Sequence, residues 1–256
     1  MTARILTRLF LSGALGLVLA TSLGGPAPAW TDVPEGAVAE MAFPAGTVVR
    51  IALEDERLGR RARESRDLYA DQVVPFLEAN GLRDAVRFDV DDALYTRDTP
   101  STVRISALRD TAVLERLEAH RDWPDVVRHH ADGWSGADVF TTELDAPLEL
   151  RFDPEKFYTL AIAWADPDHP GDYNRYLDGV AEDFERVGAR FVHKFRDLDY
   201  ATRQGGAGVP PLQITLVEWD RADGLAALLS GSRYREHRPL FDRGVSEFRF
   251  YRLGRF

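Results

Sequence analysis

The side chains in this sequence best suited to acid–base chemistry near neutral pH are its six histidines. His129 and His130 are adjacent and follow Trp123, and they are candidate catalytic residues that could transfer a proton or ligate a haem iron. Because neighbouring residues on a helix point about 100° apart, at most one of the two easily faces a pocket. The alternative is a structural role at a helix end, where imidazole suits the negative dipole.

His193 lies in an apolar stretch whose residues alternate as they do in a strand. The alternation predicts that Phe191, His193 and Phe195 share one face. If that face lines a pocket, His193 is a buried polar group that requires a partner. The other interpretation is a histidine with a satisfied structural role.

Large aromatic residues at the ends of predicted strands and helices could form a flat apolar surface for an aromatic ligand. They could equally belong to an ordinary core. Together with the histidine above, the candidate ligand-binding residues are Trp123, Trp164, His193, Trp219 and Tyr234.

Several common catalytic signatures are absent from the sequence. It contains no HExxH, EF-hand loop, GxSxG, or GxGxxG after a strand, so metal hydrolysis, serine hydrolysis and dinucleotide chemistry lose their usual support. The glycine-rich stretch 205–208 lacks the phosphate-loop pattern and is interpreted as a lid or a hairpin extension. With no cysteine in the chain, disulfides and thiolate metal sites are excluded, and no metal site is predicted.

The pattern of predicted strands and helices that positions these residues occurs twice in the sequence. Matching landmarks recur 107 to 111 residues apart, namely Gly81 with Gly188, Asp110 with Asp220, Phe140 with Phe250, and Trp123 with Tyr234. Such spacing indicates an internal duplication.

In the first half, strands are expected at 48–53, 85–90, 102–108 and 137–144. One helix should reach Asn80, with a kink at Pro75 because proline removes a helical hydrogen bond. A second helix should begin near Asp110.

In the second half, strands are expected at 157–164, 191–195, 212–219 and 246–253. Apolar residues from Tyr173 to Val187 recur at spacings of three and four, which predicts an amphipathic helix ended by Gly188. A second helix should follow Asp220.

Each half is therefore a βαββαβ unit, and the predicted class is α+β with tandem ferredoxin-like repeats. One such unit leaves a sheet face uncovered, whereas two units can close their sheets on each other as an intrachain dimeric α/β barrel. The expected organisation is a signal peptide over 1–29, an N-terminal arm over 30–46, repeats over 47–146 and 156–256, and a connector between them.

Three segments carry a resemblance to the dimeric α/β-barrel superfamily: FYTLAIAWADPDHPGDYNRYLDGV (157–180), LQITLVEWDRADGLAALLSGSRYREHRP (212–239) and SEFRFYRL (246–253). The first half resembles it through ALRDTAVLERLEAHRDWPDVVRHH (107–130). The resemblance implies a ligand pocket between each sheet and its helices. Members include cofactor-independent monooxygenases, haem enzymes and proteins without known activity. It also implies a catalytic or ligand role for His237, although the strand 157–164 lacks the asparagine of haem-degrading members.

The N-terminus predicts export. Arg4 and Arg8, the apolar stretch 9–20 and the Ala27-Pro28-Ala29 site follow the order of a Sec-type signal peptide, so a periplasmic or secreted location is expected. The full chain has 32 basic and 42 acidic residues, a net charge of −10 that argues against nucleic acid or an anionic membrane surface as a partner.

The sequence thus predicts an exported barrel that binds a small apolar or aromatic molecule, with oxygenase-like activity as one reading. The alternatives are a non-catalytic binding or structural protein and a haem-binding protein. A cofactor is either haem or not required, and assembly into a homo-oligomer stays open.

Overall fold

The computed structural model describes residues 37–96 and 98–256. The predicted signal peptide and the first part of the arm, residues 30–36, lie outside these residues. Within the described part, no helix is long and apolar enough to cross a membrane.

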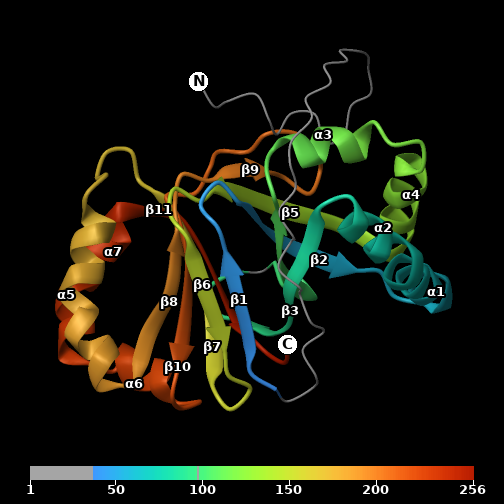
Figure 1. The fold of residues 1–256 in the computed structure, drawn as a ribbon. Coiled ribbons are helices and arrows are strands. Elements are labelled where there is room, and N and C mark those ends of the chain that lie inside the picture. Colours follow the sequence, from blue (N-terminus) through green and yellow to red (C-terminus); the bar gives the residue numbers. More distant parts are fainter. Residues whose placement is uncertain (1–36, 97) are drawn as a thin grey trace.

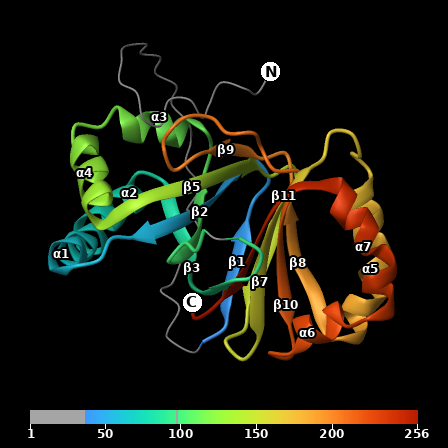
Figure 2. The same cartoon turned by 180° about the vertical axis from the view of Figure 1, so that it is seen from behind.

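Both halves contain the predicted βαββαβ order, with helices on two opposite sides of a central set of strands (Figures 1 and 2). The first repeat consists of β2 (Val48–Glu56), α1 (Arg60–Leu68), a π-helical turn η2 (Tyr69–Val73), α2 (Val74–Ala79), β3 (Leu82–Ala93), β4 (Thr102–Leu108), α3 (Ala112–Glu118), α4 (Trp123–Gly133) and β5 (Trp134–Glu143). The second consists of β7 (Phe157–Ala165), α5 (Asp172–Arg186), β8 (Ala189–Phe195), β9 (Asp199–Ala201), β10 (Gln213–Trp219), α6 (Gly224–Leu229), α7 (Ser232–Gly244) and β11 (Val245–Leu253).

The predicted disturbance at Pro75 takes the form of a wider turn rather than a break. The π-helical turn η2 ends at Val73, and Pro75 then occupies the first turn of α2. The Val74 N–H donates to the Tyr69 carbonyl five residues back, and this π-type turn lets the continuous helix accommodate proline, which has no N–H. The helix ends before Gly81, whose φ of 96° is readily adopted only by glycine.

Nine strands of the described residues form one sheet in the order β8-β10-β7-β11-β3-β4-β2-β5-β9. The two repeats are joined by strand pairing. The last strand of each repeat pairs with a segment of the other repeat, namely the end of that repeat's second strand or a short strand that continues it. Thus β11 pairs with the end of β3, and β5 pairs with β9, which follows β8 after three residues. Because β8 and β9 are almost continuous, the two ends of the sheet are joined and the strands close as a barrel.

The barrel interior is one apolar core shared by both repeats. Ile51 and Ile105 of the first repeat and Leu160 and Leu216 of the second belong to the same cluster and are fully buried. Separate apolar clusters lie between each sheet and its own helices. The duplication therefore solves the problem of the uncovered sheet face, as the sequence predicted.

The segments expected to be an arm and a connector each contain a strand. β1 (Ala39–Phe43) and β6 (Leu148–Phe152) pair antiparallel, and both alternate between buried and exposed residues. Their buried side chains, including Phe43 and Phe152, join the core of the barrel. An alternation of only five residues between prolines and glycines is too short to be distinctive in a sequence.

A buried ion cluster, formed by Asp138, Arg203 and Arg249, joins the two repeats. Asp138 of β5 accepts hydrogen bonds from the Tyr200 hydroxyl at 2.8 Å, the Arg203 backbone N–H at 3.0 Å and Arg249 Nη1 at 3.1 Å. All three donors belong to the second repeat. The Arg249 guanidinium also lies 4.9 Å from the ring centre of Trp164.

We expect Asp138→Ala to destabilise the whole barrel, because it leaves the buried Arg249 and the Tyr200 hydroxyl without their acceptor. The expected loss in the free energy of unfolding, measured by urea titration, is about 3–5 kcal/mol. The control is Glu247→Ala, which removes the exposed partner of Arg249 and should cost about 1 kcal/mol or less. Equal losses in both variants would contradict this role for Asp138.

Candidate functional site

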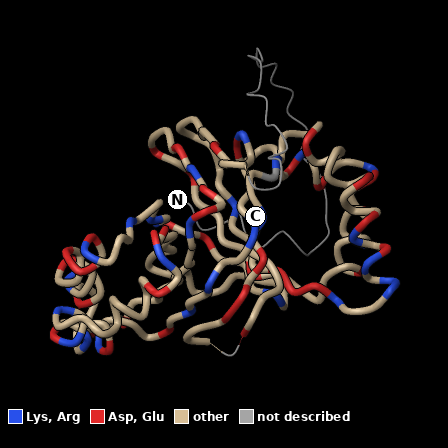
Figure 3. Tube along the Cα trace, turned by 90° about the horizontal axis from the view of Figure 1, so that it is seen from below, with Lys and Arg blue, Asp and Glu red and all other residues tan. Residues whose placement is uncertain are grey.

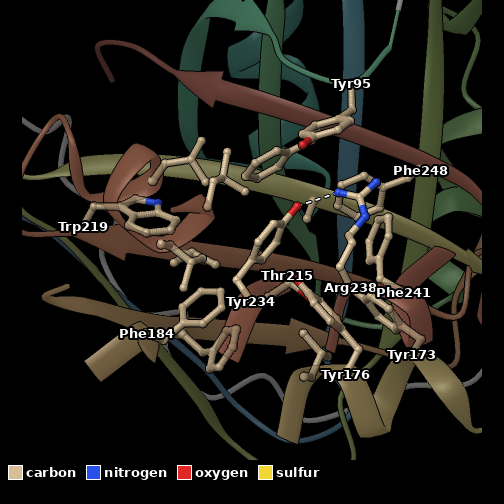
Figure 4. A pocket seen from close by; sticks show the side chains of 18 residues that line it. Tyr95, Tyr173, Tyr176, Phe184, Thr215, Trp219, Tyr234, Arg238, Phe241 and Phe248 are labelled. Carbon is tan, nitrogen blue, oxygen red and sulfur yellow. Dashed lines mark hydrogen bonds between the residues drawn. The ribbon is translucent and has the colours of Figure 1, made fainter. Parts of the chain in front are cut away.

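A cavity lies between the outer face of the second sheet and helices α5, α6 and α7 (Figure 4). Of the described residues that line it, ten are aromatic: Tyr95, Tyr173, Tyr176, Phe184, Phe191, Trp219, Tyr234, Phe241, Phe248 and Phe250. The sheet contributes small side chains such as Ala161 and Thr215 to its floor. The site can therefore surround a flat apolar molecule with ring faces and edges.

Helix α5 forms one wall because its apolar residues recur at spacings of three and four. Tyr173, Tyr176 and Phe184 all point from it towards the sheet and are buried. Two glycines let α7 and its end approach α5 closely. A Cβ on Gly244 would lie 2.5 Å from the backbone nitrogen of Tyr173, and a Cβ on Gly179 would overlap the ring of His237.

The polar atoms of the cavity gather at one end, around Arg238. Its Nη1 donates to the Tyr234 hydroxyl at 2.5 Å and its Nε to Asp242 Oδ1 at 2.6 Å. The Tyr95 ring lies nearby, with its centre 6.0 Å from the guanidinium carbon of Arg238. The guanidinium lies 4.8 Å from the ring centre of Phe241. Burial would lower the pKa of Arg238, but these hydrogen bonds outweigh it and raise the pKa, so the cation persists at every physiological pH.

Tyr95 belongs to the other repeat. It follows β3, whose end pairs with β11, and the Leu94 N–H donates to the Phe250 carbonyl at 2.7 Å. The pairing that closes the barrel therefore brings Tyr95 onto the second repeat's cavity. Its ring lies 6.0 Å from that of Phe248.

The buried phenols of the cavity keep their protons. Burial raises the pKa values of Tyr173 and Tyr176 well above the ordinary value. Tyr173 forms hydrogen bonds with Thr215 and Gln213. These hydroxyls therefore act as hydrogen-bond donors, not as bases.

Two predicted ligand-binding residues line the cavity, Trp219 and Tyr234. Trp219 also donates from Nε1 to Thr159 Oγ1 at 2.9 Å. Trp164 lies instead in the barrel core, where its Nε1 donates to the Val209 carbonyl at 2.8 Å. Trp123 packs half-buried against the helices of the first repeat.

The predicted common face of Phe191, His193 and Phe195 is wrong. The register of β8 against β10 shifts at Leu216/Val217, so Phe191 packs in the outer cluster and Phe195 in the barrel core. The extra residue of this bulge is Val192. His193 packs edge-on to Phe195 at 4.5 Å and lines a separate hollow together with Thr142 and Arg196.

The three histidines predicted to be catalytic lie outside the cavity lining. His237 packs against Gly179 between α7 and α5, and its Nδ1 is buried with no partner among the described residues. His130 stacks on Trp134 at 4.9 Å, and His129 accepts a hydrogen bond from Ser65 at its backbone carbonyl. Their catalytic role stays a prediction.

In the first repeat, charged side chains fill the space that corresponds to the cavity. Glu54 of β2 is buried, 3.3 Å from Arg104 Nε and 3.6 Å from His130 Nε2. Burial would raise the pKa of Glu54, but the His130 side chain and the charges of Arg104 and Arg50 lower it to about 2. The second repeat has Ala161, Thr215 and Val217 on this face of its strands, which leaves room for the cavity.

The cavity lining does not fit a haem. No histidine occurs among the described residues that line it, and its buried tyrosines resist ionisation, so it offers neither imidazole nor phenolate to an iron. Among the residues that the structure describes, no group of three or more histidine or carboxylate side chains could hold a metal ion.

No protein-family model matches the chain, and no curated protein sequence matches it. Several solved structures do superpose on it. An anthrone oxidase-like protein superposes with a TM-score of 0.51 at 10% identity, over 83% of this chain and 94% of that one. A candidate monooxygenase from Fusobacterium nucleatum superposes with a TM-score of 0.45 at 11% identity, over 82% of this chain and 93% of that one. A mutant chlorite dismutase from Candidatus Nitrospira defluvii superposes with a TM-score of 0.46 at 8% identity, over 83% of this chain and 93% of that one.

The strand order and the likeness to the anthrone oxidase-like protein show the fold: the chain has the dimeric α/β-barrel fold, with both ferredoxin-like halves in one polypeptide. At 10% identity the likeness concerns the fold alone.

We expect Glu54→Gln to change how stability depends on pH. The folded pKa of about 2 lies below the ordinary 4.5, so the ionised carboxylate stabilises the fold above about pH 4.5, and this contribution is lost as the pH falls towards 2. Near neutral pH the substitution should lower the free energy of unfolding by about 3 kcal/mol. Urea titrations near neutral pH and near pH 2 measure the difference, which should vanish at the acidic end.

The control for this prediction is Asp125→Asn on α4, because the side chain of Asp125 is exposed and its ion pair with Arg128 is a surface one. It should leave the pH profile unchanged. A stability difference for Glu54→Gln that is the same at both pH values would contradict a lowered pKa.

Proposed function

We propose that this protein binds a small, flat aromatic molecule in the cavity of its second repeat. The observation that carries the proposal is the lining, in which aromatic rings from α5, α7, β8, β10 and β11 meet around one space. Tyr176 and Phe241 pack edge to face at 5.2 Å, as do Phe241 and Phe248 at 4.9 Å. Rings already held by their neighbours lose little freedom when a planar ligand packs against them.

The setting that we propose for this binding is the periplasm or the exterior of the cell. Its support is the signal-like order of residues 1–29. We propose neither a nucleic acid nor a membrane as a partner. The net charge of −10 supports this, as does the mixing of acidic and basic residues along both helical layers (Figure 3).

A second candidate function is oxygenase-like turnover of the bound molecule, favoured by the likeness to the anthrone oxidase-like protein. In such a reaction an anthrone and O₂ give an anthraquinone and water, and a ring CH₂ must first lose a proton. None of the described lining residues is a carboxylate or a histidine that could accept it. We therefore favour binding without turnover.

An oxygen electrode separates the two candidates. With 1,8-dihydroxyanthrone as the substrate, we expect oxygen uptake with the protein to equal the rate of autoxidation without it. Uptake that rises in proportion to protein concentration, and that falls when the cavity is filled by Leu225→Trp, would establish turnover in place of simple binding.

We expect neutral 2-naphthamide to bind this cavity and to raise the temperature of unfolding, because a ligand of the native state stabilises it. Leu225→Trp places an indole in the lining of the cavity and should weaken binding about tenfold or more in calorimetric titration. The matched control is Leu58→Trp, the same change at a side chain that is 97% exposed. No binding by the wild type, or equal binding by the two variants, would overturn the proposal.

A further inference from the structure

The only charged side chain among the described lining residues, Arg238, lies at one end of the cavity, and apart from Thr215 the rest of this lining is aromatic or aliphatic. Figure 4 shows the guanidinium of Arg238 and the hydroxyls of Tyr234 and Tyr95 converging there. From this geometry we infer that the ligand is an aromatic acid, whose rings fill the apolar part and whose carboxylate binds Arg238 together with the two tyrosine hydroxyls. The inference rests on the proposed function and specifies the ligand class.

Arg238 has hydrogen-bonding capacity beyond its contacts in the structure. A guanidinium carries five N–H donors. In the structure Arg238 donates one hydrogen bond to Asp242 and one to Tyr234, and its guanidinium carbon lies 6.0 Å from the centre of the Tyr95 ring. Arginine also presents its donors as a planar fork that matches a carboxylate in geometry and charge.

The charge at this end of the cavity is positive. No acidic side chain occurs among the described lining residues. The nearest carboxylate, Asp242, holds the Nε side of Arg238, and its side chain is 54% exposed, so water screens it. The guanidinium is 34% exposed and packs on Phe241, a setting in which an ion pair is stronger than in bulk water.

The two tyrosines add neutral donors. Burial and the interaction with the Tyr95 hydroxyl raise the pKa of Tyr234 above its ordinary value, although Arg238 acts in the opposite direction. Its hydroxyl is therefore protonated near neutral pH and does not repel an anion. Rotation of either hydroxyl allows it to donate to a bound oxygen.

Tyr95 makes ligand selection depend on both repeats. It comes from the first repeat, whereas Arg238 and Tyr234 lie on α7 of the second. The first repeat, whose own corresponding space is filled by Glu54 and Arg104, therefore contributes a specificity residue to its neighbour.

The test compares 2-naphthoate with 2-naphthamide, which have the same rings and nearly the same shape but differ in charge. For the full chain in calorimetric titration, we expect 2-naphthoate to bind about tenfold more tightly than the amide. Arg238→Gln should abolish this preference while leaving the affinity for the amide, which also reports that the variant is folded. Tyr95→Phe should reduce the preference about threefold.

The matched control is Arg233→Gln, the same change on the same helix. Arg233 forms an ion pair with Glu182 and is not part of the lining. It should keep the full preference, and this preference should decrease as salt is added. If Arg238→Gln does not fold, the preference for 2-naphthoate over 2-naphthamide in the wild type and in Tyr95→Phe still tests the inference.

The outcomes separate the two proposals. Equal binding of the acid and the amide by the wild type overturns the aromatic-acid inference and leaves the proposed function intact. Binding of neither compound overturns both. A preference that persists in folded Arg238→Gln, or that is lost equally in Arg233→Gln, shows that Arg238 does not recognise the carboxylate.

Discussion

The structure depends on one exchange of backbone hydrogen bonds between the repeats. Each fourth strand, β11 or β5, pairs with the extension of the other repeat's second strand. Without these pairings each sheet would present an open edge and an apolar face to water, both of which are costly. With them, the interior becomes one core, Asp138 meets its three donors, and Tyr95 reaches the cavity of the other repeat.

The two repeats share a backbone plan but have different interiors on their helical sides. In the first, a buried ion pair between Glu54 and Arg104 lies on the face of the sheet towards the helices, beside the apolar cluster, and His130 lies 3.6 Å from Glu54. In the second, small and apolar strand residues leave the space between sheet and helices open to aromatic side chains. The two repeats thus differ on this side: the first contains a buried ion pair, and the second contains the aromatic cavity.

The sequence was sufficient to predict the architecture because its strongest signals are periodic. The spacing of Tyr173, Leu177 and Phe184 indicates a helix with one buried side, and the repeated landmarks indicate the duplication. Two of the predicted ligand-binding residues, Trp219 and Tyr234, line the cavity of the second repeat. The sequence did not predict the bulge at Val192, because one extra residue has no visible effect on composition. This residue nevertheless moves every later side chain of the strand to the other face.

The sequence did not give the positions of other side chains, because these positions depend on packing between distant elements. The direction of His237 is set by the absence of a side chain on Gly179, which lies on another helix. Tyr95 follows a strand of the first repeat and reaches the cavity only through the pairing of β3 with β11. Arg238 gives no motif, and only its contacts with Tyr234 and Asp242 single it out from the other arginines of α7.

Amide hydrogen exchange, followed residue by residue at increasing urea concentration, tests most directly whether the two repeats form one cooperative barrel. The account predicts that the amide of Leu94, which bonds to Phe250 across the junction, and the central amides of β4 and β10 all exchange with the free energy and urea dependence of global unfolding. If one repeat instead exchanges at a much lower free energy while the other stays protected, the repeats are separate units and the shared core is not what holds the fold together.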